Sequence, residues 1–154
     1  MKSLIPKQRF EKQEDPTAAN EEVQLDFAGP FFSNSNAKSY LLVAIDSFSR
    51  FPSAAIVKST SSSKIIKFLK GYIALHGVPK NIKSDQFSGF KSREVAEFCK
   101  SVGINQRFCP VDDHRGCGIV ERCIQTLKRR IATCLHDSKN FEEVLINVLF
   151  SHCL

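Results

Sequence analysis

The stretch that decides the fold runs from residue 83 to residue 130. It opens with Lys83-Ser84-Asp85-Gln86-Phe87-Ser88-Gly89-Phe90 and closes with Gly116-Cys117-Gly118-Ile119-Val120-Glu121-Arg122, followed by a basic run through Lys128-Arg129-Arg130. Asp85 and Glu121 are separated by 35 residues (121 − 85 − 1 = 35). A third acid, Asp26, lies upstream in the apolar segment Val23-Gln24-Leu25-Asp26-Phe27. Three carboxylates brought together would make a site for hard divalent cations, because Mg²⁺ and Mn²⁺ prefer oxygen ligands.

Three strands are predicted upstream of this stretch, at residues 22–32, 39–47 and 54–57. The first alternates apolar and polar residues, which is typical of a strand with one buried face. Asp26 then points away from Leu25 and Phe27, and the competing interpretation is the exposed face of an edge strand. Gly29-Pro30 is expected to end this strand. Asp46 stands at the end of the second strand and is interpreted as a turn former.

Helices and strands alternate in the rest of the chain. A helix follows the cap-rich residues 60–63 and stops at Gly77-Val78-Pro79. A short strand at 81–84 places Asp85 at its exit, where active sites of parallel sheets gather. A helix at 92–102, a strand at 104–109, a helix at about 119–135 and a last helix from about residue 140 follow. Residues 110–118 are predicted to form a loop.

Each acid and basic group also has a purely structural interpretation. Asp85 could be an ordinary turn residue, and Glu121 a first-turn acid that complements the helix dipole. The basic run 128–130 could be a solvated helix end. The three acids together support a functional site more strongly than any one of them does alone.

Bulk properties limit the class of protein. A chain of 154 residues is expected to form one domain, residues 21–154, behind a tail or linker at residues 1–20. A net charge of +6 favours polyanion partners such as nucleic acid. The six cysteines lack zinc-type spacing and are expected to be reduced and mostly buried. Nothing resembles a signal peptide or a membrane span, so a nuclear or intracellular location without membrane contact is expected.

The motifs resemble a known family. Leu25-Asp26-Phe27-Ala28-Gly29-Pro30, then Ser84-Asp85, then Gly118-Ile119-Val120-Glu121-Arg122 resemble the catalytic core of retroviral and retrotransposon integrases, and most of all those of gypsy-type LTR retrotransposons. The resemblance covers residues 21–150. It implies an α/β fold, namely an RNase H-like mixed five-stranded sheet flanked by helices, which is here truncated at its C-terminal end. The expected element order agrees with that fold.

The resemblance also implies a site and a reaction. Asp26, Asp85 and Glu121 would be catalytic and would hold two Mg²⁺ or Mn²⁺ ions for phosphoryl transfer. The reaction would process DNA ends and join a DNA 3′-OH to target DNA. Lys128, Arg122 and Arg129 would contact DNA, and the core would form homo-oligomers.

Departures from the family pattern keep other hypotheses open. Gln86-Phe87 follows the second Asp where the family has Asn-Gly or Gln-Gly, and Cys117-Gly118 stands where Asn-Gly is common. These changes affect loop geometry and remove no carboxylate. The family's zinc and C-terminal DNA-binding domains are not recognised in this sequence. The alternatives are a catalytically inactive, domesticated or truncated remnant that binds DNA or self-associates, and a different RNase H-like nuclease.

Overall fold

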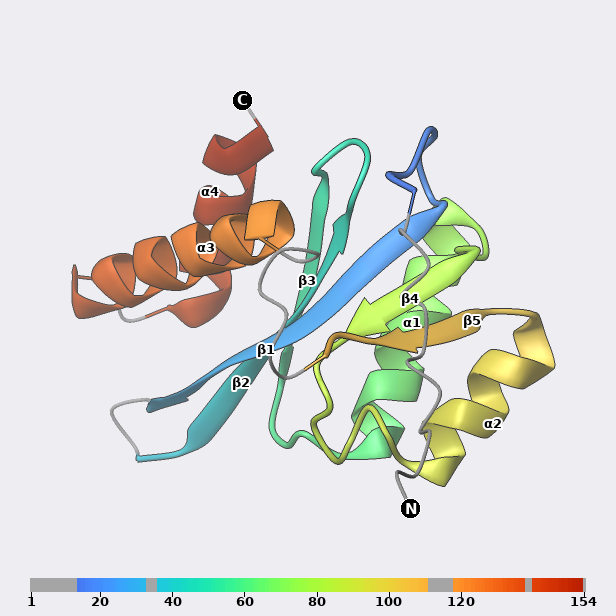
Figure 1. Ribbon diagram of the computed structural model, residues 1–154. Coiled ribbons are helices and arrows are strands. Elements are labelled where there is room, and N and C mark those ends of the chain that lie inside the picture. The colour runs from blue at the N-terminus through green and yellow to red at the C-terminus, as the bar shows by residue number, and fades with distance from the viewer. Residues whose placement is uncertain (1–13, 33–35, 111–117, 138–139, 154) are drawn as a thin grey trace, which may run out of the picture.

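The computed structural model describes residues 14–32, 36–110, 118–137 and 140–153. Strands and helices follow one another in the predicted order (Figure 1). The strands are β1 Glu22–Phe32, β2 Lys38–Asp46, β3 Pro52–Val57, β4 Asn81–Ser84 and β5 Asn105–Phe108. The helices are α1 Ser62–His76, α2 Arg93–Val102, α3 Gly118–Asp137 and α4 Phe141–Cys153.

The strands form one mixed sheet in the order β3-β2-β1-β4-β5. β1, β2 and β3 are an antiparallel meander, and β4 and β5 run parallel to β1. β1 is therefore the middle strand. This position excludes the edge-strand interpretation of Asp26, because β2 pairs along one side of β1 and β4 pairs with its first three residues on the other.

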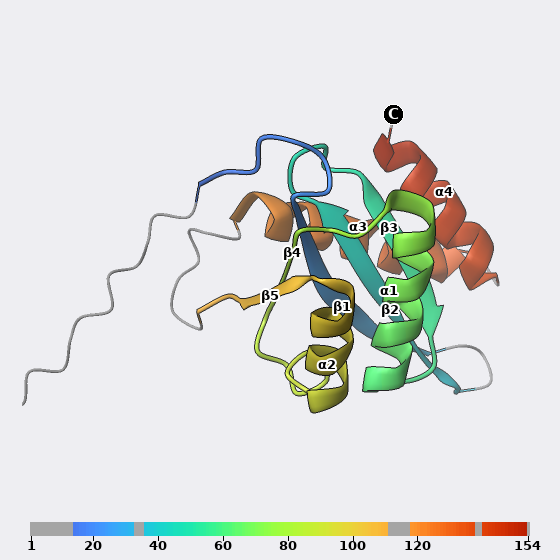
Figure 2. The ribbon, with the colours of Figure 1, turned by 90° about the vertical axis from the view of Figure 1, so that its right-hand side faces the viewer.

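Helices cover both faces of the sheet, with α1 and α2 on one side and α3 and α4 on the other (Figures 1 and 2). Alternate residues of the strands serve two separate cores, as the period-two pattern requires. Val23, Leu25, Leu42 and Ala44 pack with Ile65, Leu69, Val95 and Cys99 of α1 and α2. Ala28, Leu41, Val43 and Ile45 pack with Ile124, Leu127, Ile131, Val144, Leu145 and Val148 of α3 and α4.

Local sequence signals set the ends of α2. The Ser92 side chain accepts a hydrogen bond from the Val95 amide, so it caps the N-terminus. Gly103 follows the last turn at φ +82°, in the left-handed region that glycine enters without strain.

Asp46 is confirmed as a turn former, because its Oδ2 accepts a hydrogen bond from the Ser49 amide at 2.7 Å.

Two expectations need correction. β1 does not end at Gly29-Pro30 but continues to Phe32, and a shift of its register against β2 between Ala28 and Phe31 accommodates the glycine and proline. Cys109 is disulfide-bonded rather than reduced. The reduced state of Cys99 does agree with expectation.

The predicted domain boundary after residue 20 stays a prediction, and residues 1–13 lie outside the described part of the chain. Asn20 itself is tied to the core. Its backbone amide donates a hydrogen bond to Asp46 Oδ1 at 2.7 Å, and its side-chain Oδ1 accepts a hydrogen bond from the Tyr72 hydroxyl at 3.1 Å.

Candidate active site

The parallel pairing of β1 and β4 brings two of the predicted acids together. Val23 pairs with Ile82 and Gln24 with Lys83. Asp26 lies two residues beyond the last of these pairs on β1, and Asp85 directly follows β4, so the two acids lie at the same end of neighbouring parallel strands. Asp26 shares the sheet face of Gln24, which is the face covered by α3 and α4, because side chains alternate along a strand.

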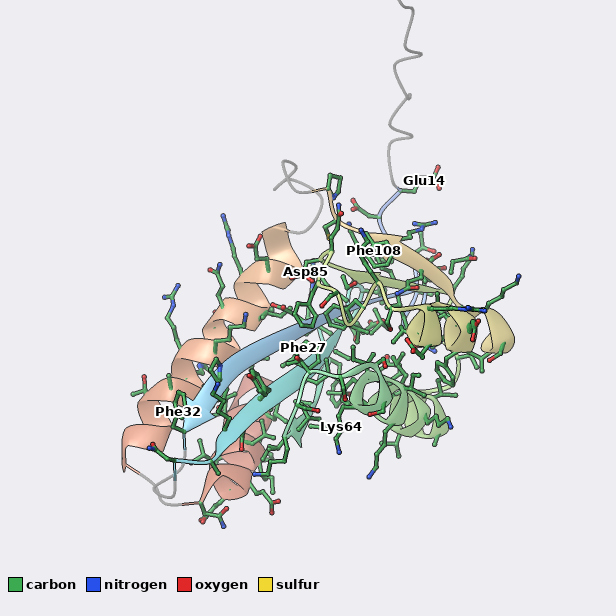
Figure 3. All side chains as sticks on the ribbon, turned by 90° about the horizontal axis from the view of Figure 1, so that it is seen from below. Glu14, Phe27, Phe32, Lys64, Asp85 and Phe108 are labelled. Carbon is green, nitrogen blue, oxygen red and sulfur yellow. The ribbon has the colours of Figure 1, made fainter. Side chains whose placement is uncertain are left out.

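The segment after β4 is held by a hydrogen bond to the side chain of Asp85 and by aromatic packing. The Phe87 amide donates to Asp85 Oδ1 at 3.0 Å, so the side chain of Asp85 closes a local turn. Phe27 of β1 stacks on Phe90 with ring centroids 5.3 Å apart and meets Phe87 edge-on at 5.9 Å. Figure 3 shows Phe27 and Asp85 in the same region of the molecule. The departure Gln86-Phe87 therefore brings a stabilising aromatic contact into this loop.

Lys128 of α3 reaches across to the first acid. Its Nζ lies 3.1 Å from Asp26 Oδ2, and the two side chains are 37% and 30% exposed. Burial raises the pKa of the Asp26 carboxyl, the Lys128 ammonium lowers it, and the charge of Asp85 raises it again, which leaves the pKa above the ordinary value of an aspartate. The two acids therefore lie near enough for the charge of Asp85 to disfavour ionisation of Asp26.

This pair of carboxylates suits a hard divalent cation, which would relieve the repulsion between them. Glu121 does not join the pair in this structure. It lies exposed in the first turn of α3. In the described part of the chain, no three Asp, Glu, His or Cys side chains form a group that could hold a metal ion. The three-carboxylate site stays a prediction, of which the structure brings two members together.

The predicted DNA-binding residues lie on α3. Arg122 and Arg129 are exposed, whereas Lys128 is half-buried against Asp26. Arg129 also lines a groove of about 600 Å³ between α3 and α4, together with Arg130, Thr133, Asn147, Val148 and Ser151.

Sequence reasoning missed the Lys128–Asp26 contact and the buried position of Lys83. Lys83 is only 5% exposed and shares the sheet face of Asp85. The alternation of side chains along β4 is the sequence signal that could have predicted the orientation of Lys83.

The fold and the paired acids define a class. A mixed five-stranded sheet with this order and helices on both faces is the RNase H-like fold of integrase catalytic cores. Residues 16–114 match the family model described as integrase core domain. The chain belongs to the integrase core domain family.

Individual relatives agree with this membership. The chain is 31% identical over 89% of its length to "Uncharacterized protein K02A2.6" of Caenorhabditis elegans. It is 23% identical over 91% of its length to the retrovirus-related Pol polyprotein from transposon 412 of Drosophila melanogaster. It spans only 10% and 11% of these two proteins. The gypsy-type assignment stays a prediction that the transposon relative fits.

Solved structures are similar as well. The chain matches a chain of the simian T-cell lymphotropic virus intasome in complex with the PP2A regulatory subunit B56 gamma, with a TM-score of 0.78 and 27% identity, over 90% of this chain and 50% of that one. It matches the HTLV-2 integrase catalytic core domain in complex with magnesium (dimeric form) with a TM-score of 0.71 and 26% identity, over 88% of this chain and 87% of that one. No helix in the described residues is long and apolar enough to span a membrane.

Proposed function

We propose that this chain is the catalytic core of a metal-dependent polynucleotidyl transferase of the retrotransposon integrase type. It processes DNA ends as an endonuclease and joins a DNA 3′-OH to target DNA. The observation that supports the proposal is the parallel pairing of β1, which carries Asp26, with β4, which Asp85 directly follows, on an integrase core fold. The magnesium named for the HTLV-2 relative supports the choice of cation.

The three acids are metal ligands in this proposal. Two Mg²⁺ or Mn²⁺ ions would supply the charge that activates the attacking oxygen and stabilises the leaving oxygen. Asp26, Asp85 and Glu121 would hold these ions as carboxylate ligands. Because Glu121 is exposed and apart from the pair in this structure, the proposal requires the first turn of α3 to move toward the sheet.

Three basic residues of α3 would hold the DNA. Arg122 and Arg129 project from α3 into solvent, where they can meet phosphates. Lys128 stands beside the carboxylate pair, where the reacting end of the DNA would lie. Such contacts release counterions, so the affinity for DNA should fall as salt is raised.

The test is cleavage and joining of double-stranded oligonucleotides by the full chain with Mn²⁺ or Mg²⁺. Asp85→Asn should abolish both reactions and leave the fold intact, because the asparagine oxygen can still accept the Phe87 amide hydrogen bond. Asp15→Asn is the matched control, since Asp15 is exposed and precedes the first strand of the sheet. Activity that survives in the Asp85→Asn variant would refute the site assignment.

The second candidate is a catalytically inactive remnant that binds DNA or self-associates. The exposed position of Glu121 favours it, because the third carboxylate is not assembled. A folded wild-type chain that binds DNA but cleaves none with either metal would select this candidate.

We also propose homo-oligomerisation and a nuclear location, where the DNA partner lies. The relatives include HTLV-2 cores in dimeric and trimeric forms. In this chain Ile146 and Phe150 of α4 are 66% and 67% exposed and share one helix face at i and i+4. Sedimentation should show a species larger than the monomer. Ile146→Asp, which places a charge on the exposed face of α4, should dissociate this species. A monomer at high concentration would contradict the proposal.

A further inference from the structure

We propose that Lys128 is a built-in counter-cation of Asp26, which a divalent metal ion has to displace, and that its ammonium group then becomes available to a DNA phosphate. This inference rests on the proposed function, because it assigns regulation to the same site. It makes Lys128 a residue that links metal loading to DNA binding.

The geometry supports the first half of the proposal. Lys128 Nζ lies at hydrogen-bonding distance, 3.1 Å, from Asp26 Oδ2. The contact joins residues 102 positions apart, and α3 is anchored around it by the buried side chains of Ile124, Leu127 and Ile131. The ammonium group is therefore delivered to the carboxylate by a packed helix and not by a chance surface encounter.

A metal ion and the ammonium group compete for the same carboxylate. A ligand oxygen of Mg²⁺ lies about 2.1 Å from the ion, so an ammonium on that oxygen would stand next to a double positive charge. In a half-buried site this repulsion is only weakly screened. The metal and the Lys128 contact are thus mutually unfavourable.

The local charge becomes more positive when the metal binds. A divalent ion adds two positive charges to a site that holds Asp26, Asp85 and Lys128, with the buried Lys83 in β4. The more positive site attracts a phosphate more strongly. The half-exposed, unbranched Lys128 side chain can swing outward without moving α3. Metal loading would then prepare the site for DNA.

The experiment is calorimetric titration of Mn²⁺ into the full chain, without DNA. Lys128→Met keeps the apolar stem and removes the ammonium. Arg130→Met is the matched control, because it removes one positive charge two positions further along α3, where the side chain is exposed. We expect Lys128→Met to bind Mn²⁺ about fivefold more tightly than the wild type, which is the largest effect expected from breaking such a half-exposed ion pair, and the affinity of Arg130→Met to differ by less than about twofold.

Two results would overturn the inference. Equal affinities for Lys128→Met and Arg130→Met would show that the contact does not compete with the metal. Weaker binding by Lys128→Met would show that Lys128 supports Asp26 as a ligand. Circular dichroism should confirm that both variants are folded.

A further variant separates this inference from the proposed function. Asp26→Asn should lose Mn²⁺ binding in both the wild-type and the Lys128→Met background. If Asp26→Asn binds Mn²⁺ as the wild type does, the metal site of the proposed function fails. If binding depends on Asp26 but Lys128→Met brings no gain, only the inference about Lys128 fails. Failure of both the wild type and Lys128→Met to bind Mn²⁺ overturns the two together.

Discussion

Replacing Phe90 with alanine tests the packing that supports the candidate site. Phe90 is 1% exposed, stacks on Phe27 and meets Phe87 edge-on at 6.1 Å. Removing a buried phenylalanine costs about 3–5 kcal/mol through lost transfer energy and the remaining cavity. A domain of this size is stabilised by only about 5–15 kcal/mol, so the variant should fold but with a large deficit.

The assay is urea unfolding followed by circular dichroism. With a slope of about 2 kcal/mol per molar urea, a loss of about 4 kcal/mol lowers the midpoint by about 2 M. Leu75→Ala is the control, because Leu75 of α1 is 82% exposed and its loss should stay within about 0.5 kcal/mol. A Phe90→Ala loss below about 1 kcal/mol would refute the packing of the aromatic cluster beneath the Asp85 loop.

Three further predictions concern single residues. The folded-state pKa of Asp26 is raised, so the contribution of its carboxyl group to stability is present at low pH and is lost as pH rises through that pKa. In urea unfolding between pH 3 and pH 7, the stability of Asp26→Asn should therefore increase relative to that of the metal-free wild type as pH rises. A stability difference that does not change with pH would contradict the raised pKa. Ser92→Ala removes the cap on the Val95 amide and should cost about 1 kcal/mol in the same assay, whereas no loss would show that the cap is not formed. Cys99 is 1% exposed and burial raises the pKa of its thiol, so it should react with a thiol reagent only after unfolding, and fast labelling of the native protein would contradict its burial.

Much of the fold follows from the sequence because hydrophobic periodicity is a local signal. The period of two predicts β1, although not that it continues past Gly29-Pro30, and the apolar run 39–47 predicts a strand that is buried on both faces. The short strand predicted at 81–84 is confirmed as β4. The closeness of Asp26 and Asp85 also follows once β1 and β4 are paired in parallel. The register itself depends on how α1 packs on the sheet, which no local pattern states.

Long-range contacts explain what the sequence could not predict. The Lys128–Asp26 pair depends on the rotation of α3 about its own axis on the sheet, which is set by the buried side chains of α3 and α4 together. The aromatic contact of Phe87 with Phe27 likewise joins a loop to the middle strand. The local signal of Gly29-Pro30 for a strand end failed because β2 continues to pair beyond it.

The most direct measurement is a crystal structure of the full chain with Mn²⁺, in which anomalous scattering locates the ion. The account predicts an anomalous peak between the carboxylates of Asp26 and Asp85, at about 2.0–2.2 Å from an oxygen of each, with Lys128 Nζ withdrawn from Asp26. Approach of Glu121 to a second peak would complete the proposed two-ion site. A well-ordered Asp26–Lys128 pair with no peak at these carboxylates at saturating Mn²⁺ would contradict the proposed metal-dependent mechanism.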